Sequence, residues 1–200
     1  WKKVCTVGSK NPTNLEQQIF FKAKKEMGIK KKVELICSEY CNSPMTSGIL
    51  SSILILPKWD EDIDENKYEY MLRHELVHIK HHDLFIKYIG LFVMAVHWYN
   101  PFVYLMFYEI SVISEMYCDS IVIGGKGEEE RRNYGELILK LAVQNKFANK
   151  RQFFIGMANS RSKWIYKRRI LEMKRAKKYK AVLPVVMTVL ICMIGGITTF

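Results

Sequence analysis

Apolar residues recur along the first half of the chain with spacings that predict one helix, two strands and then a second helix. Residues 13–29 carry apolar side chains at helical spacing, and Gly28 is expected to end that helix. Residues 30–40 and 48–57 are apolar runs with the features of strands. The stretch at residues 59–66, which is rich in acidic side chains, is expected to form a solvated loop that leads into the second helix. The pattern therefore predicts an α+β fold with a small sheet.

A strongly apolar stretch at residues 84–108 cannot continue as one helix. Asn100 and Pro101 interrupt it, because proline lacks the N–H of the helix ladder and disfavours helix in the residue before it. Each half is too short to span a bilayer by itself. The stretch is expected to form a helical hairpin, which either dips into a membrane or packs against membrane spans. Residues 124–135 are expected to be a flexible linker before a further helix over 135–147.

The C-terminal part divides into a basic segment and an uncharged one. Residues 161–180 hold ten Lys and Arg against one Glu, a net charge of +9 within the chain's +11. Residues 181–200 hold no charged side chain and are long enough to form a transmembrane helix. Because basic residues beside a span face the cytoplasm, residues 161–180 are expected to be a juxtamembrane anchor on anionic lipid rather than a nucleic-acid surface. Residues 1–160 then form one folded domain on the cytoplasmic side.

Composition fits a membrane-associated protein in a reducing compartment. Hydrophobic residues make up 49% of the 200 residues, which leaves room for a membrane-associated portion. The five cysteines are expected to be reduced in the cytoplasm and to form no disulfides. The abrupt start and the end inside an apolar run lead us to expect a fragment of a longer, multi-pass protein of the cell membrane.

Two histidines and a glutamate give the chain its most specific chemical pattern. His74, Glu75 and His78 form the sequence H-E-x-x-H on the predicted second helix, which begins near Glu65 or Asn66. A step of four residues on an α-helix turns the side chain by only about 40° and raises it by roughly 6 Å, so both imidazoles can reach one zinc ion. Glu75 lies beside that ion without binding it, where it can accept a proton from water.

Other arrangements of the histidines fit a metal less well. The plainest alternative is a solvated helix face that carries two histidines by chance. His81 faces the same way as His74, but roughly 10 Å of helix separates them, which is too far for one ion. His78 and His82 have the spacing of ligands, yet Ile79 occupies the position of the base. We therefore expect His81 and His82 to form the polar end of the helix.

A third protein ligand is expected from an acidic pair further along the chain. Glu115 and Asp119 are four residues apart on a segment of helical period, so their carboxylates share one face. Their neighbours are apolar, and an unpaired charge there would be costly. One carboxylate can bind the ion while the other accepts the free N–H of a ligating imidazole. Glu109 and Asp83 are rival ligands, although Asp83 is expected to continue the helix of His78 and to point away from the metal.

Several segments together resemble the membrane-embedded zinc peptidases of the beta-lactam sensor-transducer (antirepressor) family. That family reads approximately H-E-L-x-H-x-x-x-x-D-L, then W-x-N-P, then E-x-x-C-D, after an upstream S-P-x-x-x-G. The resemblance covers most of residues 30–200, although residues 80–82 are Lys-His-His where the family often carries arginines. The matching positions are Ser43, Pro44, Gly48, His74, Glu75, Leu76, His78, Asp83, Leu84, Trp98, Asn100, Pro101, Glu115, Cys118 and Asp119.

The resemblance implies a gluzincin-type zinc metallopeptidase. It implies one zinc ion on His74, His78 and Glu115, with Glu75 as the general base, and it leads us to expect Asp119 to orient a histidine. The substrate implied is a cytoplasmic protein, either a transcriptional repressor or the chain itself, cleaved when an external signal such as a beta-lactam is sensed.

Some functional questions stay open at the level of sequence. A membrane quality-control peptidase would share the ligand pattern, and a non-proteolytic transducer with a structural metal is an alternative of another class. The presence of Glu75 counts against the transducer, because a structural metal needs no base. Residues 49–56 are either an edge strand that pairs with the backbone of a substrate or an internal strand. No direct contact with nucleic acid is expected, and a homodimer remains open.

Overall fold

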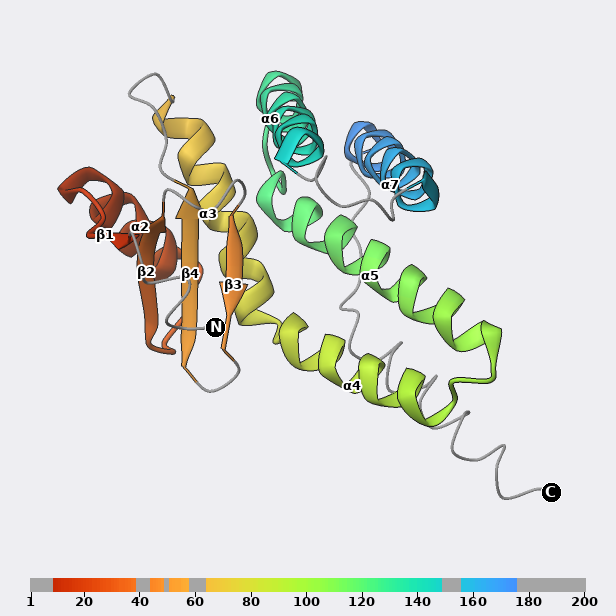
Figure 1. Cartoon of the computed structure of the whole chain (residues 1–200). Helices are drawn as coiled ribbons and strands as arrows, with labels where there is room; N and C mark the ends of the chain where they lie inside the picture. Colours follow the sequence, from red (N-terminus) through yellow and green to blue (C-terminus); the bar gives the residue numbers. More distant parts are fainter. Residues whose placement is uncertain (1–8, 39–43, 49–50, 58–63, 149–155, 176–200) are drawn as a thin grey trace.

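Ten elements make up the part of the chain that this computed structural model describes, namely residues 9–38, 44–48, 51–57, 64–148 and 156–175 (Figure 1). The fold is α+β and mostly helical, as the sequence predicts in outline. In chain order the elements are β1 (Ser9–Lys10), α2 (Asn14–Glu26), β2 (Val33–Ser38), β3 (Met45–Ser47), β4 (Ser52–Pro57), α3 (Glu65–Lys80), α4 (Asp83–Val96), α5 (Pro101–Val122), α6 (Glu128–Ala148) and α7 (Gly156–Lys174).

The four strands form one sheet in the order β1-β2-β4-β3. Strands β2 and β4 are parallel, whereas β3 pairs with β4 in the antiparallel sense with Met45 opposite Ile55. All six residues of β4 are buried, and β4 has a neighbouring strand on each side. Of the two roles open to residues 49–56, the internal strand is therefore the correct one for the part that β4 covers. Among the described strands, β3 forms the edge of the sheet that lies nearer to the later helices.

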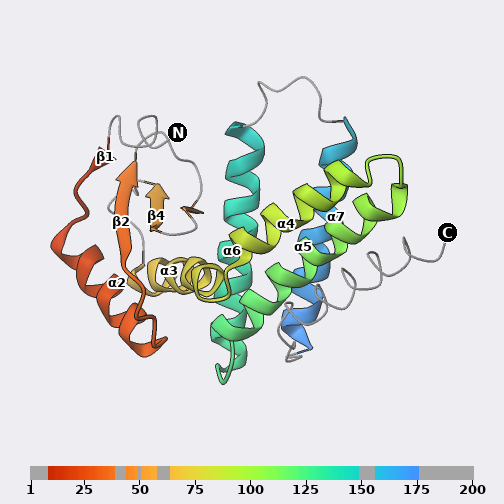
Figure 2. The same cartoon turned by 90° about the horizontal axis from the view of Figure 1, so that it is seen from below.

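Helix α3 lies across one face of this sheet together with α2 (Figure 2). It begins at Glu65 as predicted, because the side chain of Asp64 accepts a hydrogen bond from the Asn66 N–H at 3.1 Å and caps the first turn. Its apolar face packs into the main core: Leu72 and Leu76 are fully buried there with Leu54 of β4. Because this face is buried against the sheet, the opposite, polar face of α3 is held in a fixed orientation.

A sharp joint separates α3 from α4. Helix α3 ends at Lys80, and His82 adopts a left-handed backbone conformation with φ of 55°, which no helix can continue. Helix α4 starts immediately afterwards at Asp83. The prediction that Asp83 continues the helix of His78 is therefore wrong, and its carboxylate turns back toward α3.

Helices α4 and α5 form the predicted helical hairpin, which extends away from the sheet (Figure 1). Asn100 caps α5 by accepting a hydrogen bond from the Phe102 N–H at 3.0 Å, and Pro101 occupies the first helical position. Gly90 lets the two helices approach, since a side chain there would collide with the ring of Phe107. No described helix is both long and apolar enough to cross a membrane, and residues 181–200, where the sequence predicts a span, lie outside the described residues.

Helices α6 and α7 lie beside α3 and α5 and complete the fold (Figure 2). Helix α6 begins at Glu128, seven residues earlier than the sequence pattern predicts. Three glutamates in its first turn explain the difference, because negative side chains stabilise the positive end of a helix. Residues 128–135 of the expected linker are thus helical, and they bring Tyr134 into the main core.

Candidate metal centre

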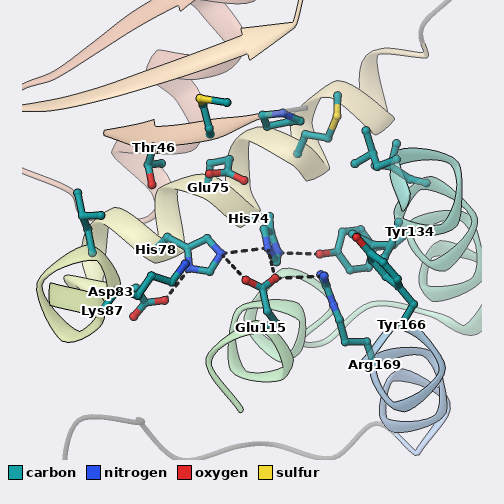
Figure 3. Close-up of a pocket in the computed structure, with 17 residues that line it drawn as sticks. Thr46, His74, Glu75, His78, Asp83, Lys87, Glu115, Tyr134, Tyr166 and Arg169 are labelled. Carbon is teal, nitrogen blue, oxygen red and sulfur yellow. Dashed lines mark hydrogen bonds and ion pairs between the residues drawn. The ribbon is translucent and has the colours of Figure 1, made fainter. Parts of the chain in front are cut away.

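The two histidines of α3 point the same way and meet on the face turned away from the sheet. The Nε2 atoms of His74 and His78 are 3.2 Å apart, and the two rings are nearly perpendicular, with centroids separated by 4.8 Å. Their spacing along one helix produces this arrangement, as the sequence predicts. Both rings therefore offer a lone pair to the same point in space (Figure 3).

Glu115 of α5 approaches that point from the opposite side (Figure 3). One carboxylate oxygen lies 3.4 Å from Nε2 of His74, and the other lies 3.7 Å from Nε2 of His78. Ligand atoms of the three side chains all lie within 4.8 Å of one another. Two imidazoles and one carboxylate are a donor set that catalytic zinc uses, with a fourth position left open. The residues present therefore fit a zinc ion.

A second grouping with metal-ligand chemistry occurs among the described residues. His78, Asp83 and Cys118 also bring ligand atoms within 4.8 Å of one another, and all three lie deep in the fold. Burial raises the pKa of the Cys118 thiol well above its usual range, and the neighbouring carboxylate of Asp83 adds to the effect. The carboxylate of Asp83 is already engaged by Nδ1 of His78 and by the Ser114 hydroxyl, each at 2.6 Å, so the group around Glu115 is the better candidate.

Glu75 lies in the same cavity as the candidate ligands. The cavity has a volume of about 320 Å³ and is lined by the face of α3 that carries His74 and His78, by Glu115 and by Met45 and Thr46 of the edge strand β3. Figure 3 shows Glu75 on the strand side of His74, next to Thr46. A carboxylate and the outer strand of the described sheet thus border one space.

Asp83, predicted to point away, instead holds His78 in place. Its carboxylate is 2.6 Å from Nδ1 of His78 and accepts a second hydrogen bond from the Ser114 hydroxyl, also at 2.6 Å. Burial alone would raise the pKa of Asp83, but the hydrogen bonds from His78 and Ser114 outweigh it, and the pKa is lowered. An ionised Asp83 keeps the proton of His78 on Nδ1 and leaves Nε2 free for a metal.

Substituting Asp83→Asn is expected to weaken zinc binding by roughly 10- to 100-fold, the usual effect of losing a carboxylate that orients a ligating histidine. The Ser114→Ala substitution, which removes only the other hydrogen bond to that carboxylate, should have a smaller effect. Competition with a chromophoric chelator measures both affinities. An unchanged affinity in the Asp83→Asn protein would show that His78 needs no such partner.

Asp119 faces His74, partly through a tyrosine. The hydroxyl of Tyr134 donates to Asp119 at 2.7 Å and lies 2.9 Å from Nδ1 of His74, while the carboxylate itself is 3.4 Å from that nitrogen. Burial would lower the pKa of His74, but Asp119 and Glu115 together raise it to about 9. These carboxylates therefore favour the protonated form of His74, with which a metal ion would compete.

Arg169 of α7 closes this network. Its guanidinium donates two hydrogen bonds to Asp119, both at 2.7 Å, and reaches Glu115 at 3.1 Å. Burial would raise the pKa of Asp119, but the charge of Arg169 lowers it to about 2, so this carboxylate stays ionised. The same charge helps to hold the pKa of Glu115 well below its usual range. Both acidic side chains are thus available as anions in the interior.

Sequence reasoning missed Tyr134 and Arg169. The sequence presents Arg169 as one of ten basic residues in a predicted lipid anchor, whereas its side chain is only 6% exposed. An arginine with Tyr166 three residues before it and Met173 four residues after it is the one signal that could have indicated a buried position.

Comparison with known proteins identifies the family of this chain. The family model described as BlaR1 peptidase M56 matches residues 1–173. The chain is 33% identical to the regulatory protein BlaR1 of Bacillus licheniformis over 122 residues, which are 61% of this chain and 20% of that protein. It is 30% identical to the methicillin resistance mecR1 proteins of Staphylococcus aureus and Staphylococcus epidermidis over 115 residues, 57% of this chain and 20% of each of those proteins. The match thus spans about a fifth of the length of these relatives. Because the family model covers most of the sequence, the chain belongs to the BlaR1 peptidase M56 family.

Proposed function

We propose that this chain is the zinc-dependent endopeptidase part of a membrane-bound signal transducer with a gluzincin-type site. The observation that carries the proposal is the convergence of His74, His78 and Glu115 on one point beside Glu75. A structural metal would need neither a neighbouring base nor an open cavity. Membership of a peptidase family supports the same reading.

In this proposal each side chain has a distinct task. Zinc held by His74, His78 and Glu115 would polarise the scissile carbonyl and activate water at neutral pH. Glu75 accepts the proton of the attacking water and passes it to the leaving amine. Asp83 fixes the orientation of His78, while Asp119 and Tyr134 fix that of His74.

The free edge of β3 gives an extended substrate a place to bind. β3 has one neighbour in the described sheet, and its residues Met45 and Thr46 line the cavity that holds Glu75. An extended peptide could therefore add to this edge with its backbone facing the metal ligands. The substrate we propose is a protein, either a transcriptional repressor or the chain itself, because the relatives are named as a regulator and as resistance proteins.

Metal analysis with two matched glutamate variants tests the zinc site. Purified in detergent, the full chain should bind one zinc ion, and Glu115→Gln should weaken binding by more than the roughly 10- to 100-fold expected for a residue that only orients a ligand. Glu109→Gln, a change on the same helix that breaks a surface ion pair with Arg168, should leave zinc bound. If Glu109→Gln releases zinc and Glu115→Gln does not, the assignment of Glu115 as the third ligand is wrong.

Proteolysis is followed in the same preparations with unfolded β-casein and with the chain itself as substrates. A chelator should abolish cleavage, and added zinc should restore it. Cleavage that persists after the metal has been removed would contradict the proposed function.

A further inference from the structure

An exposed apolar surface covers the outside of the α4–α5 hairpin. The residues from 88 to 108 contain no Asp, Glu, Lys or Arg. Large side chains among them face outward: Phe92, Trp98, Tyr99 and Phe102 are each about 70% exposed. On α4 the exposed residues recur every three or four positions and make one stripe along the helix, formed by Phe85, Tyr88, Phe92 and Val96. We call this stripe and the turn that follows it (residues 97–102) the hairpin surface.

Several backbone groups of the turn find hydrogen-bond partners within the hairpin. The carbonyl of His97 accepts a hydrogen bond from the Asn100 N–H at 2.9 Å, and the carbonyl of Trp98 accepts one from the Tyr104 hydroxyl at 3.0 Å. The Asn100 side chain in turn caps the Phe102 N–H. Backbone N–H and C=O groups need such partners within the protein wherever water is excluded, as it is inside a membrane.

Positively charged side chains lie near the hairpin, and anionic lipid attracts such charge. Lys87 is exposed at the start of the uncharged run, and α7, which packs on α5, carries the exposed side chains of Lys167 and Lys174. Trp164 of α7 stacks near Tyr108 and lies against the guanidinium of Arg168, an aromatic and cationic pairing common at membrane interfaces. A second protein copy would need no such excess of positive charge.

We propose that the hairpin surface inserts into the headgroup and upper acyl region of one anionic membrane leaflet. A 14-residue helix that presents an apolar stripe can lie in this region with its apolar side buried by about 5–10 Å. The zinc cavity would then lie close to the bilayer surface, since Leu84 and Lys87 of α4 line it. This inference rests on exposure and charge and is independent of zinc and of proteolysis.

Depth-dependent fluorescence quenching tests the insertion. Trp1, Trp59 and Trp164 are replaced by phenylalanine, so that Trp98 reports alone, and the full chain is reconstituted into phosphatidylcholine and phosphatidylglycerol vesicles that carry brominated acyl chains. Trp98 emission should shift to the blue and be quenched, more strongly by bromine near the start of the acyl chain than by bromine near its end. Aqueous acrylamide should quench it weakly.

Two charge substitutions locate the effect. Phe92→Glu, on the hairpin surface, should cause loss of the bromolipid quenching. Leu139→Glu, at an exposed apolar position on α6, should leave it unchanged, and circular dichroism checks that both variants fold. Trp98 that is open to acrylamide and unaffected by bromolipid overturns the proposal. Protection from both quenchers also overturns it, and assigns the hairpin surface to a second copy or another protein.

Discussion

Replacing Glu75 with glutamine is expected to slow cleavage by about 10²- to 10⁴-fold while zinc stays bound, because the amide keeps the shape of the side chain but cannot accept a proton. Glu75 borders the cavity without contributing to the group of metal-ligand atoms. The loss should therefore appear in kcat, and metal analysis of the same protein should give the wild-type zinc content.

Glu69→Gln is the matched control on the same helix. Glu69 pairs with Arg73 through a bond of 2.6 Å and does not line the cavity. Removing its charge should change cleavage by no more than a few-fold, since Glu26 also pairs with Arg73. Wild-type cleavage by the Glu75→Gln protein would exclude Glu75 as the general base, and parallel loss of zinc would assign it a role in metal binding instead.

Arg169→Met is expected to destabilise the fold by about 3–5 kcal/mol, the usual effect of leaving buried charges unpaired, which corresponds to a fall of roughly 6–20 °C in the unfolding temperature. Two carboxylates depend on this guanidinium, and Asp119 is only 2% exposed. Thermal unfolding in detergent, followed by circular dichroism, measures the change.

The neighbouring arginine provides the comparison for this variant. Arg168 pairs with Glu109 at 2.8 Å, but both side chains are about one-third exposed, and such pairs contribute about 0–1 kcal/mol. Arg168→Met should therefore unfold near the wild-type temperature. Adding Asp119→Asn to Arg169→Met should restore part of the lost stability, because one unpaired anion is removed. Equal unfolding temperatures for the two arginine variants would contradict the buried network.

Local patterns in the sequence predicted the parts of the site that lie on single helices. The four-residue spacing of His74 and His78 on a helix starting at Glu65 was sufficient to place both rings on one face. The acidic pair Glu115 and Asp119 was found in the same way, from helical spacing among apolar neighbours. That these two helices meet was inferred from the shared chemistry and the family resemblance, and α3 and α5 do pack together.

Such local patterns could not predict contacts between residues far apart in the sequence or an unusual backbone conformation. The turn of Asp83 back toward His78 depends on a left-handed residue at His82, a conformation that histidine adopts more readily than most residues but that helical spacing does not reveal. Arg169 reaches Asp119 across 50 residues of sequence, and spacing along the chain carries no trace of that contact. The assignment of the sheet edge likewise required the pairing of β3 with β4, which the strand pattern alone left open.

The joint between α3 and α4 determines the direction in which the Asp83 side chain points relative to His78. Asp83 is the first residue of α4, so a residue inserted ahead of it that became the new first residue would turn the carboxylate by about 100° around that helix and away from His78. The number of residues in the joint is therefore constrained far more tightly than their identity. This asymmetry explains how Lys-His-His at positions 80–82 can replace arginines without disturbing the geometry around the ligands. Engineered libraries at these positions should accept many residue types and reject changes of length.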